Sequence, residues 1–153
     1  MTIAIEPLED ASAKASLCAR LSAELPMWFG RPESNAEYIR GMATRDAFAA
    51  FVRGAPEGLI ALDYHFGTTC NLWWLGVSPK VHRCGVGRAL VERAFKEASQ
   101  RGCAWLAVET MSPRTLSPEY DITHRFYEAL GFHPFVEFEP EPGDYMMWMM
   151  RSV

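Results

Sequence analysis

The chain has 153 residues, of which 49% are hydrophobic and 22% are charged, and its formal net charge is −4. This is the balance of an ordinary globular domain. The small negative charge argues against nucleic acid and anionic membranes as partners, because both attract basic surfaces. No apolar run reaches the ~18 residues that a membrane helix needs, and no basic segment leads into a long apolar run at the start. We therefore expect residues 1–153 to form a single cytoplasmic domain.

Hydrophobic periodicity, with glycine and proline as punctuation, predicts seven strands and four helices. In chain order we expect a strand at 2–7, helices at 10–25 and 34–45, strands at 47–53, 57–66 and 69–78, a helix at 85–101, a strand at 103–110, a helix at 119–130 and strands at 132–139 and 144–151. Hairpin-like runs occur before the long helix and at the end of the chain. This mixed order predicts an α/β fold with a sheet of mixed strand direction.

The turn at 82–88 has the composition of a phosphate-binding site. The start of a helix leaves backbone N–H groups unpaired and carries the positive end of the helix dipole, so it attracts phosphate. Gly85 and Gly87 would let a pyrophosphate approach these amides, and Arg83 and Arg88 add donors and positive charge. We therefore expect a phosphorylated ligand at this turn.

Two common phosphate-binding schemes do not fit this turn. A Walker A loop needs Lys and then Ser or Thr after its second glycine, but Arg88 and Ala89 follow Gly87. A dinucleotide fingerprint needs a third glycine, which is missing.

Residues 82–87, His-Arg-Cys-Gly-Val-Gly, resemble motif A of the GNAT superfamily of N-acetyltransferases. That motif reads Gln or Arg, two residues, Gly, one residue, then Gly or Ala, so His82 is a departure. Upstream, residues 75–79 resemble the end of the family's splayed fourth strand. Downstream, residues 126–132 resemble its FYxxxGF segment. The resemblance implies a curved, mixed sheet of about seven strands flanked by about four helices, with strands four and five parted.

The resemblance also implies a function, namely direct transfer of acetyl from acetyl-CoA to a primary amine. Tyr127 would protonate the departing sulfur, and the backbone N–H of Val77 would stabilise the oxyanion. Relatives contact the bound coenzyme A from the position that is Tyr120 here. In this chain Thr123, or the region of Ser117, would make that contact instead. The expected coenzyme A contacts are Leu75, Gly76, Val77, His82, Arg83, Cys84, Gly85, Val86, Gly87, Arg88, Ala89, Thr123 and Tyr127.

The general base is not determined by the resemblance. Some histone-directed members have a glutamate where this chain has Asn71. Glu109, at the end of the fifth strand, is our candidate, with Asp63 and His65 on the third strand as alternatives. An ordered water chain is a further alternative.

Aromatic residues mark the expected acceptor site. Trp28 and Phe29 are adjacent in an apolar segment, which would line an acceptor pocket or simply cap the sheet. Trp73 and Trp74 should point to opposite faces of a strand, because side chains alternate along it. We assign Trp28, Phe29 and Trp73 to the acceptor, which we expect to be a small-molecule amine.

Other interpretations remain open from the sequence. The acceptor amine could belong to a protein, or the chain could be a non-catalytic acyl-CoA sensor or a nucleotide-binding module with other chemistry. Residues 145–150 are apolar on both faces, which is compatible with a homodimer contact. The cysteines form no CxxC pair and have no histidine at zinc spacing, so we expect free thiols and no metal at Cys18, Cys70, Cys84 and Cys103.

Overall fold

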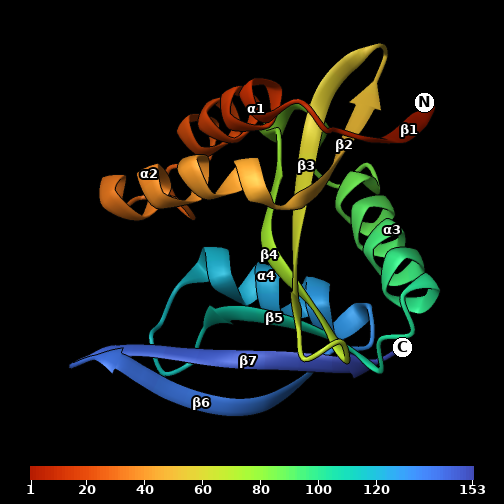
Figure 1. The fold of residues 1–153 in the computed structure, drawn as a ribbon. Helices are drawn as coiled ribbons and strands as arrows, with labels where there is room; N and C mark the ends of the chain where they lie inside the picture. Colours follow the sequence, from red (N-terminus) through yellow and green to blue (C-terminus); the bar gives the residue numbers. More distant parts are fainter.

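Seven strands form one mixed sheet in the computed structural model, which describes residues 1–153 (Figure 1). The strands are β1 (Ile3–Pro7), β2 (Asp46–Val52), β3 (Ala55–His65), β4 (Thr69–Val77), β5 (Trp105–Met111), β6 (His133–Glu141) and β7 (Asp144–Ser152). Their order across the sheet is β1-β2-β3-β4-β5-β7-β6, and only β4 and β5 pair in parallel. The sheet is strongly curved, since β2 to β4 run up Figure 1 whereas β5 to β7 run across it. The expected α/β fold with a mixed, curved sheet is confirmed.

Four α-helices flank the sheet, and polar side chains define where two of them begin. They are α1 (Ala11–Glu24), α2 (Pro32–Gly41), α3 (Val86–Gln100) and α4 (Pro118–Ala129). The Asp10 carboxylate accepts from the N–H of Ala13 at 2.8 Å, and Ser117 Oγ accepts from the N–H of Tyr120 at 3.3 Å. The helix expected at 34–45 ends earlier, at Gly41, and a short 3₁₀ turn, η1 (Met42–Thr44), follows it. A second such turn, η2 (Pro79–Val81), follows β4.

Each face of the sheet has its own apolar core. The larger cluster joins the sheet to α3 and α4 and includes Leu90, Leu106 and Phe132. The smaller cluster joins β2, β3 and β4 to α1 and includes Leu21 and Leu59. The first face is therefore called the α3 face, and the second the α1 face.

The sheet parts between its fourth and fifth strands. Their parallel pairing covers three residue pairs, Thr69 with Trp105, Cys70 with Leu106 and Asn71 with Ala107. Beyond Asn71 and Ala107, β4 continues to Val77 and β5 to Met111, but these two strands no longer pair with each other. The splay expected for these strands is therefore present, and it leaves a gap that connects the two faces of the sheet.

The expectation that Trp73 and Trp74 point to opposite faces is wrong. Ala61 of β3 pairs with Trp74 and Leu62 pairs with Leu72, so Trp73 is an extra residue in β4. Such a β-bulge breaks the alternation of side chains. Both tryptophans consequently pack against the core of the α1 face.

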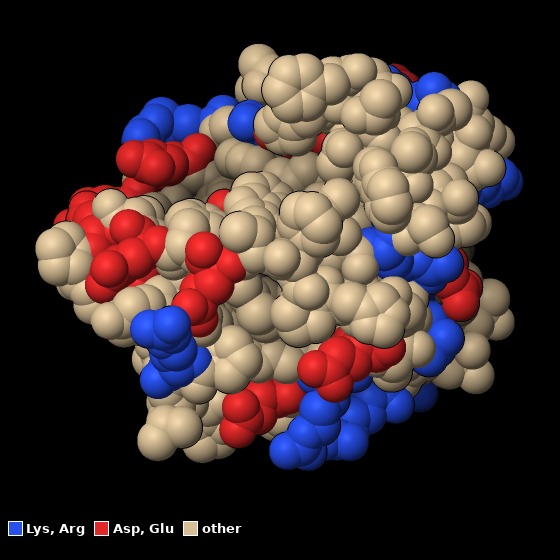
Figure 2. All heavy atoms as spheres, turned by 90° about the horizontal axis from the view of Figure 1, so that it is seen from below, with Lys and Arg blue, Asp and Glu red and all other residues tan.

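The closing hairpin has one buried face and one more open face. Met147 and Met149 of β7 are buried in the core of the α3 face, whereas Trp148 between them is half-buried. On the edge strand β6, Phe135 and Val136 are exposed. Figure 2 shows the molecule from this side, with a broad uncharged area bordered by acidic and basic side chains. No helix of the structure is both long and apolar enough to cross a bilayer.

Candidate active site

A cavity of about 790 Å³ occupies the gap between β4 and β5. Its walls come from β4, β5, the start of α3, one side of α4 and the segment that joins α1 to α2. The cavity therefore reaches the glycine-bearing turn and both faces of the splayed sheet.

A row of backbone N–H groups lies unpaired along the turn before α3. The first hydrogen bond of this helix runs from the N–H of Ala89 to the carbonyl of Gly85, at 3.0 Å. The six preceding N–H groups, from Arg83 to Arg88, donate to no protein acceptor. Arg83 and Gly85 both have positive φ angles, of 60° and 85°, which curl the turn. Such a concave row of amides at a helix start has the geometry that binds anions in proteins.

The two glycines of this turn have different structural roles. Gly85 has the left-handed backbone conformation that glycine adopts without strain, and no atom would obstruct a Cβ there. At Gly87, by contrast, a Cβ would lie 3.2 Å from the ring of Phe126 on α4. Gly87 therefore allows α4 to pack closely on the start of α3.

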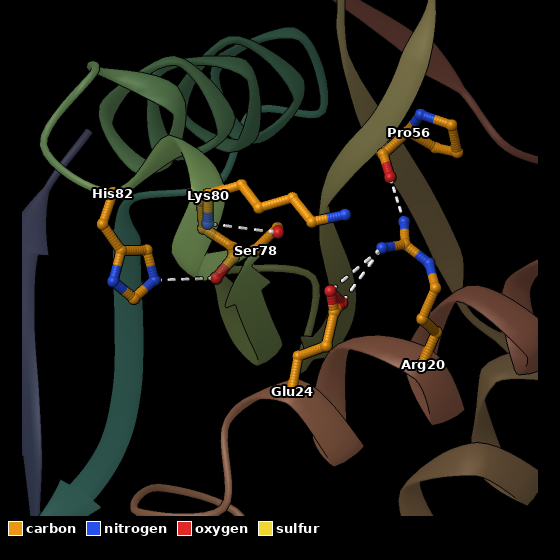
Figure 3. Close-up of polar contacts among 7 residues, drawn as sticks. Arg20, Glu24, Pro56, Ser78, Lys80 and His82 are labelled. Atoms are coloured by element: carbon orange, nitrogen blue, oxygen red, sulfur yellow. Dashed lines mark hydrogen bonds and ion pairs between the residues drawn. The ribbon is translucent and has the colours of Figure 1, made fainter.

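His82 connects this turn to the end of β4. Its Nε2 lies 2.8 Å from the carbonyl oxygen of Val77 and donates to it, because a carbonyl can only accept (Figure 3). The N–H of Ser78 donates to Glu57 of β3 at 2.7 Å. Successive N–H groups along a strand point to opposite sides, so the N–H of Val77 points away from β3 and into the gap.

Tyr127 lies on α4 and is only 5% exposed. Its ring packs edge-on against Phe126 and Phe132, with centroid distances of 5.1 Å and 5.4 Å. The hydroxyl makes no hydrogen bond to another protein group, and the residue lines the cavity. Burial raises the pKa of Tyr127 above its ordinary value, and Tyr120 adds to this effect. The hydroxyl therefore stays protonated at neutral pH and can donate a proton into the cavity.

Glu109 is the only carboxylate among the residues that line the cavity. It follows Val108 of the α3-face core, so alternation along β5 places its side chain on the α1 face. It has no hydrogen bond and no ion pair within the protein. Partial burial raises the pKa of Glu109, and the negative charge of Asp144 raises it further. Glu109 is thus an unpaired carboxylate with a raised proton affinity.

The two alternative bases are held away from the cavity. The Asp63 carboxylate lies 3.8 Å from Arg45 and 3.5 Å from the ring of His65. Neither Asp63 nor His65 lines the cavity. Of the three candidate bases, only Glu109 does.

The segment between α1 and α2 crosses the cleft and attaches to α4. Trp28 Nε1 donates to Thr123 Oγ1 at 3.1 Å, and the Tyr120 hydroxyl donates to the backbone carbonyl of Trp28 at 3.1 Å. The Trp28 ring also meets His82 edge-on, at 6.1 Å between centroids. Trp28 therefore touches both α4 and the turn that precedes α3.

Most of the residues expected from the sequence meet in this cavity. Trp28, Phe29, Trp73, Glu109 and Tyr127 line it, as do the expected coenzyme A contacts other than two. The two exceptions are Cys84, whose thiol donates to the His82 carbonyl at 3.5 Å, and Ala89. The hydroxyl of Thr123 lines the cavity but already accepts from Trp28 and donates to the carbonyl of Glu119.

Sequence reasoning missed several lining residues. Tyr38 on α2 and Arg125 on α4 line the cavity, yet no motif or spacing marked them, and Met146 on β7 was marked only as part of the apolar run 145–150. The sequence marks Trp74, but it does not predict the bulge in β4 that places both Trp73 and Trp74 on the α1 face. These residues are brought to the site only by the packing of distant elements.

The splayed sheet and the row of free amides at the start of α3 are features that the resemblance to GNAT acetyltransferases implies. A family model described as an acetyltransferase (GNAT) domain matches residues 43–134, which is more than half of the chain. The chain belongs to the GNAT acetyltransferase family, whose acyl donor is acetyl-CoA.

Solved structures share this fold across the whole chain. A GNAT-family protein from Desulfovibrio desulfuricans has a TM-score of 0.82 at 20% identity, over 99% of both chains. The ribosomal-protein-S18-alanine N-acetyltransferase from Escherichia coli has a TM-score of 0.75 at 20% identity, over 99% of this chain and 94% of the other. An aminoglycoside 6′-N-acetyltransferase complexed with coenzyme A has a TM-score of 0.71 at 23% identity, over 99% and 97%. No functionally curated protein is significantly similar to the chain in sequence.

Proposed function

We propose that this protein, as one N-acetyltransferase domain, transfers the acetyl group of acetyl-CoA directly to a primary amine on a small molecule. The observation that carries the proposal is the row of unpaired amides from Arg83 to Arg88, which opens onto the same cavity as Tyr127 and Glu109. A diphosphate fits this row because the amides supply hydrogen bonds and Arg83 and Arg88 supply positive charge. The parted strands leave room for the pantetheine arm.

Three groups of this chain would perform the transfer. Glu109 takes a proton from the acceptor ammonium, directly or through water, and so frees the amine to form the new N–C bond. The Val77 N–H donates to the carbonyl oxygen as that oxygen gains negative charge. Tyr127 gives a proton to the sulfur as the C–S bond breaks and regains one from the attacking nitrogen, while Glu109 releases its proton to water. The products are an amide, the free thiol of coenzyme A and one proton.

The first test is binding of acetyl-CoA followed by turnover. Acetyl-CoA should stabilise the protein by an amount that grows with the logarithm of its concentration above Kd, about 2.7 kcal/mol at 100 times Kd, and so raise the melting temperature. ATP should not replace it. A panel of amines should then release free thiol, with the acetylated product identified by mass. Stabilisation without release by any amine would favour an acyl-CoA sensor, and no stabilisation would overturn the proposal.

A matched pair of variants tests the position of the diphosphate. Arg88→Gln removes a charge that lines the cavity, and we expect it to weaken acetyl-CoA binding by about tenfold, as for the loss of one charge-assisted hydrogen bond. Lys96→Gln removes the same charge from an exposed site on the same helix that does not line the cavity. Equal effects of the two variants would contradict the proposed cradle.

A further inference from the structure

The cavity is lined by side chains from both faces of the sheet. The turn before α3 and Tyr127 belong to the α3 face, where Val86 and Tyr127 lie in the larger core. Trp73, Trp74 and Glu109 belong to the α1 face. Asn71 pairs with Ala107, and beyond this pair Trp73 and Trp74 follow on the β4 side of the gap and Glu109 on the β5 side. The acceptor therefore enters between an aromatic side chain and a carboxylate.

The aromatic wall on the α1 face is held rigidly. The rings of Trp73 and Tyr38 lie 4.9 Å apart between centroids. The guanidinium of Arg45 lies 3.7 Å from the centre of the Trp73 ring. A Cβ on Gly41 would come within 2.6 Å of this indole, so the ring rests directly on the helix backbone. The wall is thus flat and fixed before any ligand arrives.

The wall continues through a second pair of stacked rings. Trp74 is only 3% exposed and stacks on Phe29 at 5.0 Å between centroids. Both residues line the cavity, and the buried Nε1 of Trp74 has no hydrogen-bond partner. Because Trp74 is buried beneath this stack, the surface that a flat apolar group would meet here is that of the half-buried Phe29.

The charges that line the cavity favour binding of a ligand with a single positive charge on the α1 face. Three arginines line the cavity at the turn and on α3 and α4, namely Arg83, Arg88 and Arg125, whereas Glu109 is the only lining carboxylate. The nearby Asp144 is already 3.5 Å from Arg31. One unpaired negative charge is therefore available to the acceptor.

We propose that the acceptor is a small arylalkylamine, a monocation whose aromatic ring lies against the wall of Trp73 and Phe29 and whose ammonium pairs with Glu109. This inference rests on the proposed acetyl transfer and names the substrate class of the same site. The ammonium is bound by the Glu109 carboxylate, which has no partner within the protein. The ring is bound by burial of apolar surface.

Other amine classes fit this side less well. A polyamine or an aminoglycoside would bring further ammonium groups that find no second unpaired carboxylate in the lining, and an unpaired buried charge is costly. A peptide N-terminus would bring backbone groups that need hydrogen-bond partners, while the wall offers aromatic surface. The cavity of about 790 Å³ must also hold the end of the pantetheine arm, which favours a small acceptor.

The test compares acetylation of matched amines by the full chain, with acetyl-CoA binding measured separately by thermal shift. The probes are 2-phenylethylamine and tryptamine, n-butylamine as the ring-free control, spermidine and kanamycin as polycations, and an alanine-initiated tetrapeptide. We expect kcat/KM for 2-phenylethylamine to exceed that for n-butylamine by about tenfold or more, which is the effect of burying a few methylene equivalents. We also expect kcat/KM for 2-phenylethylamine to exceed kcat/KM for spermidine, for kanamycin and for the peptide.

Variants test separately where the aromatic ring and the ammonium of the acceptor bind. Trp73→Leu should raise KM for 2-phenylethylamine while leaving n-butylamine nearly unchanged. Glu109→Gln should lower kcat/KM for both amines, whereas Glu92→Gln, at an exposed site on α3 outside the cavity, should change neither.

The possible failures are distinguishable. If spermidine, kanamycin or the peptide is acetylated as fast as 2-phenylethylamine, the substrate class is wrong while acetyl transfer stands. If acetyl-CoA binds and neither arylalkylamine releases thiol, the substrate class is also wrong. If acetyl-CoA does not bind, both the inference and the proposed function fail.

Discussion

At the scale of single residues, the structure gives Tyr127 a testable role. Its ring is packed between Phe126 and Phe132, and its hydroxyl has no protein partner. Tyr127→Phe should therefore leave the melting temperature nearly unchanged and retain acetyl-CoA binding. Because the acid for the departing sulfur is lost, kcat should fall by about 10²-fold or more. A variant with full activity would show that the proton comes from another source, such as water.

The raised pKa of Glu109 predicts how activity depends on pH. Partial burial and Asp144 raise its pKa, so the carboxyl is protonated at a higher pH than an ordinary glutamate. Activity should fall as the pH drops through this raised pKa, and Glu109→Gln should remove that acid limb. The folded state binds the proton more tightly than the unfolded state, so ionised Glu109 lowers stability at neutral pH. Glu109→Gln should consequently melt no lower than the wild type at pH 7, and a clearly lower melting temperature would contradict this view.

At the scale of elements, the segment joining α1 and α2 is tied to α4 across the cleft. Trp28→Phe and Thr123→Val each remove the bond between Trp28 Nε1 and Thr123 Oγ1, so each should cost about 1 kcal/mol of stability. The double variant should be little worse than either single one, since both remove one interaction. Acetyl-CoA affinity provides the second readout. If Thr123 also contacts the donor, as the sequence predicts, Thr123→Val will weaken donor binding more than Trp28→Phe does.

The sequence predicted elements well, but not their local irregularities. Hydrophobic periodicity, with glycine and proline as punctuation, located all seven strands and four helices, although α2 and β6 contain no fully buried residue. The turn at 82–88 was recognisable because its glycines and cations are local. The bulge at Trp73 was not, because an extra residue in a strand is defined only by its pairing with β3. Likewise Tyr38 and Arg125 reach the cleft through packing between helices far apart in the sequence.

At the scale of the whole molecule, two halves of one sheet are joined by a short stretch of pairing. β4 and β5 share only the pairs from Thr69–Trp105 to Asn71–Ala107, and the gap beyond them holds the proposed donor site. Acetyl-CoA would contact β4 and α3 on one side and α4 on the other, so it should join the halves. Hydrogen exchange should then slow on binding at α4 and the end of β5 as well as at the turn before α3. The helix α1, none of whose residues lines the cavity, is the internal control. Slowing confined to residues 82–88 would mean that the ligand binds the turn alone and leaves the halves to open independently.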